Sequence, residues 1–275
     1  MTVELGVTLF RIAFWIYVAA AAAYVGYLVS LRKTFGKTAS ALLVVGLLVH
    51  AASLVVRTTA TGHPPFLNLY EYLLSFTWGI AVVYLVLELV TKNKVFGAFV
   101  VPLMTLFALV TCLTLPSKVV PALPALRSAW RVPHITSAIL AYAGFVIAFE
   151  LAIMYLVRER AERRKTSFWV ARLPSLSALD QTTYRTIAFG FLMQTLLIVT
   201  GAIWAQIAWG RYWGWDPKET WSLITWLIYA AYLHTRTTMG WRGHRSAILA
   251  IVGFAAVIFT LFGVSYLLRG LHSYA

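Results

Sequence analysis

Long apolar segments are the feature that most constrains the fold of this chain. Eight runs of 18 or more residues carry few charged side chains, and they cover roughly residues 7–30, 38–57, 69–90, 95–115, 134–157, 182–204, 219–237 and 246–268. Such a run, when helical, matches the hydrocarbon thickness of a bilayer. Backbone polar groups must be paired in lipid, and the runs lack the period-2 alternation of a membrane barrel. The sequence therefore predicts an all-α, polytopic membrane protein with about eight transmembrane helices.

Basic residues are distributed unevenly between the predicted connections. The 275 residues include 23 Lys and Arg against nine Asp and Glu, which gives a net charge of +14. With the N-terminus outside, fifteen basic residues fall in inner connections and seven in outer ones. By the positive-inside rule, this predicts a protein of the cytoplasmic membrane with both termini on the extracytoplasmic side. Because no soluble basic domain is present to bind nucleic acid, the charge indicates topology only.

Cysteine content and composition limit the remaining classes. Cys112, in the fourth run, is the single cysteine, which excludes an internal disulfide and a Cys-x-x-Cys redox or haem-attachment motif in this chain. The first run is expected to be a retained helix because its basic cluster follows it, whereas that of a signal peptide precedes it. No stretch has the composition of a soluble module, so residues 1–275 are predicted to form a single integral membrane domain.

The connection between the sixth and seventh runs is unusually aromatic. The stretch WGRYWGWDPKETW, residues 209–221, holds four tryptophans, and six of the eleven in the chain lie between residues 204 and 226. An aromatic belt at the membrane surface would enrich tryptophan only modestly. Gly210 and Gly214 also let the backbone approach another group closely. A platform for a flat, hydrophobic ligand explains both facts, whereas a belt explains only the first.

Two acidic residues in this stretch have a local explanation as well. Asp216 can cap a helix, Pro217 suits the first helical position, and Glu219 falls at the third position, as in a capping box. These acids therefore either start the seventh helix or belong to the ligand platform, and the sequence leaves both interpretations open.

Four histidines have depths that bear on function. His134 opens the fifth run and His272 follows the eighth, so both are predicted on the same membrane face as the aromatic stretch. Neutral imidazoles are common axial ligands of haem iron. His234 lies thirteen residues past Trp221, roughly 20 Å along a helix, towards the cytoplasmic side. His50 lies inside the second run, where an ionisable group is either functional or part of an interhelical hydrogen bond.

The segment WGRYWGWDPKETWSLITWLIYAAYLHTR resembles the tryptophan-rich WWD signature of haem-handling membrane proteins, here at about residues 204–221. The whole chain resembles the CcsA (ResC) type membrane subunit of system II cytochrome c synthases, and GHPPFLNLYE, residues 62–71, is similar to a segment of that family. The resemblance implies haem b (iron protoporphyrin IX) as the cofactor. It also implies a CcsB (ResB) type membrane subunit as partner, and cytochrome c haem lyase activity in that complex on the Cys-x-x-Cys-His of apocytochrome c.

Residue roles follow from the same resemblance. His134 and His272 match two external histidines that ligate haem beside the WWD surface, and His234 matches the transmembrane ligand of an inner haem. The second ligand of the inner haem is expected from the partner subunit, while His50 is either a structural residue or a ligand within this chain. The predicted outer haem surface comprises Trp209, Arg211, Trp213, Trp215 and Asp216. No nucleophile–base constellation is evident, so catalytic residues are left unassigned.

Three alternatives stay open. A transporter would have broken helices with ionisable residues near the bilayer midplane, whereas Glu71, Glu88 and Glu150 lie at or near the ends of their runs. A haem-delivery protein of the system I type typically has six spans, fewer than the eight predicted here. A membrane regulator of haem biosynthesis shares the architecture, and the intact WWD motif argues against it.

Overall fold

A computed structural model of the chain describes residues 2–119, 128–268 and 270. Within these residues the regular structure is helical and no strand occurs, which confirms the all-α prediction. The chain divides into two compact units, Met1–Pro121 (unit 1) and Ala122–Ala275 (unit 2). Each unit is described by itself below, and the assignment of residues 1–275 to a single domain stays a prediction.

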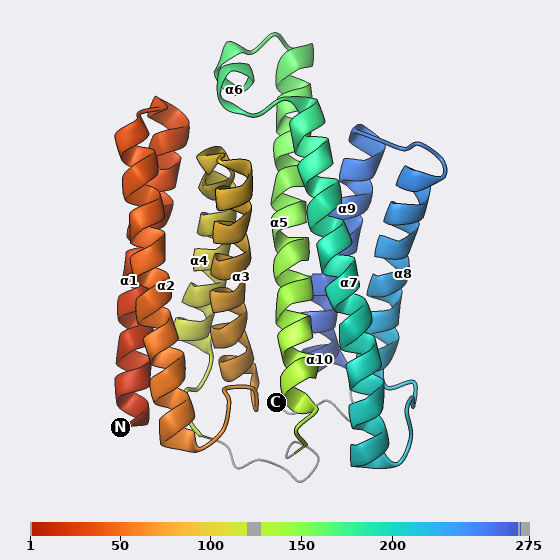
Figure 1. Cartoon of the computed structure of the whole chain (residues 1–275). Helices are drawn as coiled ribbons and strands as arrows, with labels where there is room; N and C mark the ends of the chain where they lie inside the picture. The colour runs from red at the N-terminus through yellow and green to blue at the C-terminus, as the bar shows by residue number, and fades with distance from the viewer. Residues whose placement is uncertain (1, 120–127, 269, 271–275) are drawn as a thin grey trace. The chain divides into compact units, whose positions relative to one another are not determined.

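Unit 1 is a group of antiparallel helices. It contains α1 (Val3–Ser30), α2 (Lys33–Thr61), α3 (Leu69–Thr91), the 3₁₀ turn η1 (Lys94–Phe96) and α4 (Gly97–Thr114). Helix α1 packs along α2 and against α4, and α3 packs against α4 (Figure 1). The first hairpin is tight because Leu31 takes a left-handed conformation and donates its N–H to the Tyr27 carbonyl at 2.8 Å.

Unit 2 is built around its first long helix. It contains α5 (Arg131–Arg163), α6 (Ser167–Arg172), α7 (Leu176–Trp209), α8 (Pro217–Thr237), α9 (His244–Ile258), the π-helical segment η3 (Phe259–Gly263) and α10 (Val264–Leu267). Helix α5 packs against α7 and α9, and α8 packs against α7 and α9. Consecutive long helices alternate in direction (Figure 1), so α5 starts where α7 ends, α8 starts and α10 lies. We call this the loop end of unit 2.

Seven helical segments of the described chain are long and apolar enough to cross a membrane: Val3–Ser30, Lys33–Thr61, Leu69–Thr91, Lys94–Thr114, Arg131–Arg163, Leu176–Trp209 and His244–Leu267. The protein is therefore a multi-pass membrane protein, as predicted. Helix α8, which contains the seventh predicted run, is not among the seven. Its tryptophans, tyrosines, threonines and histidine lower its hydropathy, although it has 21 residues and is long enough to span. The orientation of the termini stays a prediction.

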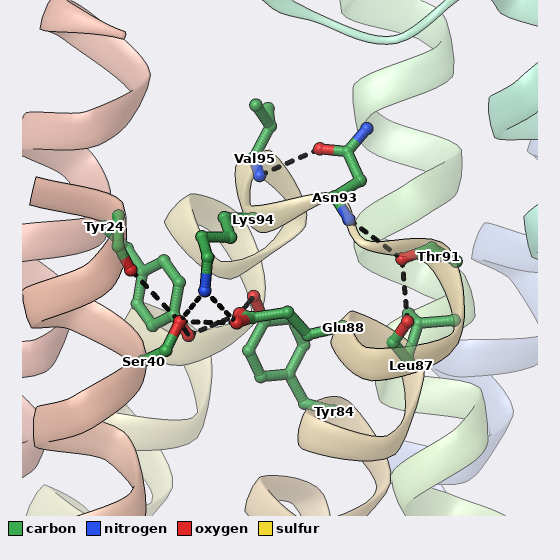
Figure 2. A network of polar contacts seen from close by, with 10 residues as sticks. Tyr24, Ser40, Tyr84, Leu87, Glu88, Thr91, Asn93, Lys94 and Val95 are labelled. Atoms are coloured by element: carbon green, nitrogen blue, oxygen red, sulfur yellow. Dashed lines mark hydrogen bonds and ion pairs between the residues drawn. The ribbon is translucent and has the colours of Figure 1, made fainter. Parts of the chain in front are cut away.

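A buried carboxylate joins the helices of unit 1. Glu88, near the end of α3, accepts hydrogen bonds from Tyr24 (2.5 Å), Tyr84 (2.7 Å) and Lys94 (2.7 Å), and the Ser40 hydroxyl donates to it as well. Figure 2 shows these four side chains converging on the carboxylate from α1, α2, α3 and η1. We call these five residues the Glu88 cluster. Because each carboxylate oxygen accepts two donors, burial of the charge is compensated.

A buried ion pair fixes the connection between α2 and α3. Arg57 and Glu71 are 2% and 1% exposed, and their side chains are 2.8 Å apart. Glu71 also accepts the N–H of Leu67 at 2.8 Å, and Arg57 donates to the carbonyl of Ser117 at 3.1 Å. One pair thus holds the α2–α3 connection and the segment after α4 together.

Candidate functional site

The aromatic stretch opens helix α8 through a capping box. Asp216 is the N-cap and accepts the N–H of Lys218 at 3.0 Å, Pro217 occupies the first turn, and Glu219 accepts the N–H of Asp216 at 3.1 Å. This confirms the local interpretation of Asp216 and Glu219, because the exposed N–H groups at a helix start need such acceptors.

The same glutamate reaches further back into the loop. Oε2 of Glu219 also accepts the N–H of Gly214 at 2.8 Å, so two alternate backbone N–H groups meet one carboxylate oxygen. Between them, Trp215 has a φ of 57°, in the left-handed region. That conformation costs a residue with a side chain about 1–2 kcal/mol, so it persists only where surrounding contacts hold it.

The tryptophans of the loop lie close together. The rings of Trp213 and Trp215 are 5.8 Å apart and perpendicular, and Trp215 is 69% exposed. Trp209 ends α7 immediately before the loop and is half-buried. Since the two rings are perpendicular, a planar ligand would stack on one ring and meet the edge of the other. Trp209, Trp213 and Trp215 thus all lie at the loop end of unit 2, and their role as a haem surface stays a prediction.

The two loop glycines have local structural reasons. Gly210 closes α7 with a φ of 72° and donates its N–H to the carbonyl of Gln206 at 3.0 Å. At Gly214 the close approach comes from Arg211, because a Cβ added there would lie 2.6 Å from the Arg211 Nε. The group that approaches the Gly214 backbone closely is thus the side chain of Arg211, which belongs to the same loop.

His134 lies in the first turns of α5, against the last turns of α7. Its Nδ1 is 3.0 Å from the carbonyl oxygen of Leu197, and its ring is 5.3 Å from that of Trp204. A carbonyl oxygen only accepts hydrogen bonds, so Nδ1 carries the proton, and the lone pair of the neutral imidazole is on Nε2. The ring fits closely over Gly201, where an added Cβ would lie 2.8 Å from the His134 Cε1.

The end of the described chain reaches the same loop. Gly270 lies so close to the carboxylate of Asp216 that no side chain would fit there. The Lys218 ammonium group donates to the Ser265 hydroxyl at 3.2 Å, which ties α8 to α10. His272, the second predicted outer ligand, lies outside the described residues, two positions beyond Gly270.

His234 lies far from this loop, near the other end of α8. Its side chain is exposed, with Nδ1 3.5 Å from the Thr238 hydroxyl. Two residues further on, Arg236 pairs with both carboxylate oxygens of Asp180 at 2.9 and 2.7 Å, which fastens this end of α8 to α7. The predicted inner ligand is therefore separate from the loop end, as its position in the sequence implies.

His50 belongs to unit 1 and is fully buried. Its Nδ1 is 3.2 Å from the Tyr17 hydroxyl of α1, and its ring is 4.9 Å from that of Phe10. Of the two interpretations of His50, a functional residue or part of an interhelical hydrogen bond, these contacts support the second.

Sequence reasoning missed three features of these units. The tight seat of His134 on Gly201 has no sequence signal, because nothing distinguishes one of 17 glycines. The bond from Glu219 to Gly214 lies outside the capping-box pattern that predicted the bond to Asp216. The Glu88 cluster has only a weak sequence signal, which is an acidic residue near the end of an apolar run.

The fold and this site define an all-α, multi-pass membrane protein with an aromatic loop and an oriented imidazole at one end. The chain belongs to the family of cytochrome c assembly proteins, whose model, described as "Cytochrome C assembly protein", matches residues 66–272. It is 43% identical over 237 residues to the cytochrome c biogenesis protein CcsA of Guillardia theta, a match that covers 79% of each chain. It is 38% identical to CcsA of Porphyra purpurea, with 82% of each chain covered. These matches confirm the resemblance to the CcsA type.

A solved structure shares the fold. The cytochrome c haem lyase CcmF superposes with a TM-score of 0.71 at 18% identity, over 95% of this chain and 47% of that one. The chain thus spans about half the length of that protein, and the likeness concerns the fold. Membership of the family assigns the chain a role in cytochrome c assembly.

Proposed function

We propose that this protein binds haem b at the loop end of unit 2 and presents it for covalent attachment to apocytochrome c. The active face is extracytoplasmic, and the protein works as the CcsA-type subunit of a haem lyase with a CcsB (ResB) type membrane partner. The observation that carries the proposal is the seat of His134, whose ring is oriented by the Leu197 carbonyl on the helix that leads into the aromatic loop.

The chemistry of His134 suits haem iron. Iron binds the unprotonated nitrogen of a neutral imidazole, and the Nδ1 hydrogen bond to Leu197 assigns that role to Nε2. Metal-bound histidines commonly donate their other N–H in this way, which fixes the ring and raises its basicity as a ligand. His272 would supply the second nitrogen ligand, as the family resemblance implies.

The loop supplies the surface for the porphyrin. Trp213 or Trp215 would stack on the macrocycle, and Trp209 would border it, because large aromatic rings bury apolar area and favour offset or edge contacts. Arg211 is exposed and would meet a propionate through its forked donors. Asp216 shapes the loop through its cap and lies at the edge of this surface.

Attachment of haem to a Cys-x-x-Cys-His segment requires alignment more than acid–base groups. Each cysteine thiol adds across a vinyl group of the haem, which is a substrate here: a carbon–sulfur bond forms, the proton goes to the neighbouring vinyl carbon, and no net oxidation occurs. The protein would contribute by holding the haem edge at a fixed angle to the incoming peptide, since orientation alone can supply much of the rate enhancement.

His234 supports a path to this site from the cytoplasmic side. It is exposed on a helix of low hydropathy, where an imidazole facing lipid alone would be costly. We infer that an inner haem binds there with a second ligand from the partner subunit. In a His234→Ala variant, haem arrival at the outer site should stop while the protein stays in the membrane, and normal cytochrome c maturation would remove His234 from the path.

The test of the outer site is the haem content of purified protein variants. The double variant Trp213→Ala with Trp215→Ala should lose about tenfold in outer-haem affinity, because two aromatic contacts are removed. Trp213→Phe should retain the haem, since another ring fills the place. If the tryptophans only anchor the protein at the membrane surface, the double variant will lower the yield while haem per folded protein and cytochrome maturation stay normal, and the proposal fails.

A further inference from the structure

The structure assigns Glu219 a role beyond starting a helix: we propose that it is the positioning residue that holds Trp215 out from the loop towards the ligand. The inference rests on the proposed haem site, and it concerns how the apoprotein prepares that site. A capping box needs Glu219 to accept only the N–H of its N-cap, Asp216. Here the carboxylate also holds Gly214, two residues earlier, at the shorter distance of 2.8 Å against 3.1 Å.

The local backbone has the form of an anion nest. Two alternate N–H groups converge on one negative oxygen when the residue between them takes a left-handed conformation. Trp215 is that residue, with a φ of 57°. A bulky aromatic residue does not adopt this conformation without support, so the Glu219 carboxylate supplies the interaction that maintains it.

The consequence is the exposure of one ring. Trp215 is 69% exposed, whereas Trp204, on the helix that leads into the loop, is 6% exposed. Its side chain projects from the loop while Trp213, at 5.8 Å, stays half-buried beside it. Without the carboxylate, Trp215 would return to a negative φ, and its Cα–Cβ bond would point elsewhere. Glu219 thus prepares an aromatic surface before the ligand arrives.

Three substitutions separate hydrogen bonding from charge. Glu219→Gln keeps the length of the side chain and an acceptor oxygen, so it should retain outer haem. Glu219→Asp keeps the charge but is one methylene shorter and cannot reach both N–H groups, so it should lose haem as Glu219→Ala does, by about tenfold in affinity. The reverse order, with Asp retaining and Gln losing haem, would overturn the proposal and make the charge itself the functional feature.

Hydrogen exchange of the haem-free protein gives a readout that does not depend on haem. In Glu219→Ala and Glu219→Asp, the amides of Gly214 and Asp216 should exchange faster than in the natural protein, while Glu219→Gln should keep their protection. Ser175→Ala serves as the control, because it removes the N-cap of α7, whose side chain accepts the N–H of Ala178 at 3.3 Å. This control should leave both the loop amides and the haem unchanged.

The outcomes distinguish the two proposals. If the loop amides lose protection but haem content stays normal, Glu219 shapes the loop without preparing the haem surface, and its proposed role is refuted. The proposed function fails only if the double variant Trp213→Ala with Trp215→Ala also keeps its haem. If Trp215→Ala loses haem while all three Glu219 variants keep both haem and amide protection, the site stands and the role of Glu219 is refuted. Equal loss of haem in Glu219→Ala and Ser175→Ala would indicate general helix destabilisation and would also refute it.

Discussion

Glu88 in unit 1 and Glu219 in unit 2 are both carboxylates with several donors, yet their donors differ in kind. Glu88 is surrounded by the side chains of Tyr24, Tyr84, Lys94 and Ser40, which come from four helical elements. Glu219 receives two backbone N–H groups from a single loop. Side-chain donors from separate helices fix how those helices pack, whereas backbone donors fix the shape of the segment that carries them.

This difference suggests that the carboxylate contacts of unit 1 serve stability, whereas those at the loop end of unit 2 serve the proposed haem site. Within the Glu88 cluster, and likewise within the Arg57–Glu71 pair, the polar atoms bind one another. These contacts stabilise unit 1 and leave few polar atoms available to bind a ligand. At the loop end of unit 2, the polar contacts orient groups that stay accessible, above all Trp215. We therefore expect substitutions in the first region to change folding, and substitutions in the second to change haem binding.

The largest effect is expected from Glu88→Ala. Removal of the carboxylate takes the Glu88 acceptor from two fully buried tyrosine hydroxyls, at a cost of about 1–3 kcal/mol each, and it also unpairs the Lys94 ammonium group, which is 31% exposed. The variant should unfold at a lower temperature and a lower denaturant concentration in detergent than the natural protein. Haem per folded molecule should be unchanged.

Glu88→Gln is the matched control for this prediction. It keeps the shape and one acceptor oxygen, so it should be destabilised less than Glu88→Ala. A Glu88→Ala protein of normal stability, or one that folds normally but lacks outer haem, would contradict the separation of the two regions.

A smaller effect, on the site itself, is expected from Gly201→Ala. The added methyl group would lie 2.8 Å from the His134 Cε1, so the imidazole must shift from its seat by the Leu197 carbonyl. Overpacking of this kind costs about 1–3 kcal/mol, and here we expect it to appear as weaker haem binding and a changed axial-ligand absorption spectrum.

Gly253→Ala controls for overpacking in the same unit. Its added methyl group would lie 2.6 Å from the Tyr229 ring, away from the contacts of His134. It should cost similar stability and leave the haem spectrum normal. If both alanine variants change the spectrum equally, or neither does, His134 is not positioned by Gly201.

The sequence predicted the helices and the loop more fully than the contacts between them. Apolar length defines a membrane helix almost by itself, so seven of the eight predicted runs reappear as apolar helices. The ends were less accurate: α5 continues to Arg163, whereas the run was expected to end at residue 157, because arginine and glutamate favour helix and the chain contains no breaker there. The seventh run was also predicted and is helical in α8, although its polar residues make this helix less apolar than the other seven.

Within the site, local patterns were predictable and tertiary contacts were not. The capping box at Asp216 follows from spacing, and the grouping of His134 with the aromatic loop follows from counting spans. The bond from His134 to Leu197 joins residues 63 positions apart, and no short pattern encodes such a contact. The left-handed conformation of Trp215 was also unpredictable, because propensity disfavours it and the contacts around it, among them those of Glu219, follow no sequence pattern.

The smallest effect on stability is expected from Tyr17→Phe, which tests whether His50 has a structural role in unit 1. The substitution removes the hydroxyl that lies 3.2 Å from the His50 Nδ1 and keeps the ring that packs between α1 and α2. Losing one buried hydrogen bond should cost about 1 kcal/mol, measurable as a modest fall in thermal stability. If His50 only joins two helices, haem content and spectrum will be those of the natural protein. If His50 is instead an iron ligand oriented by Tyr17, the spectrum will change while stability barely moves, and unit 1 would then take a direct part in haem binding.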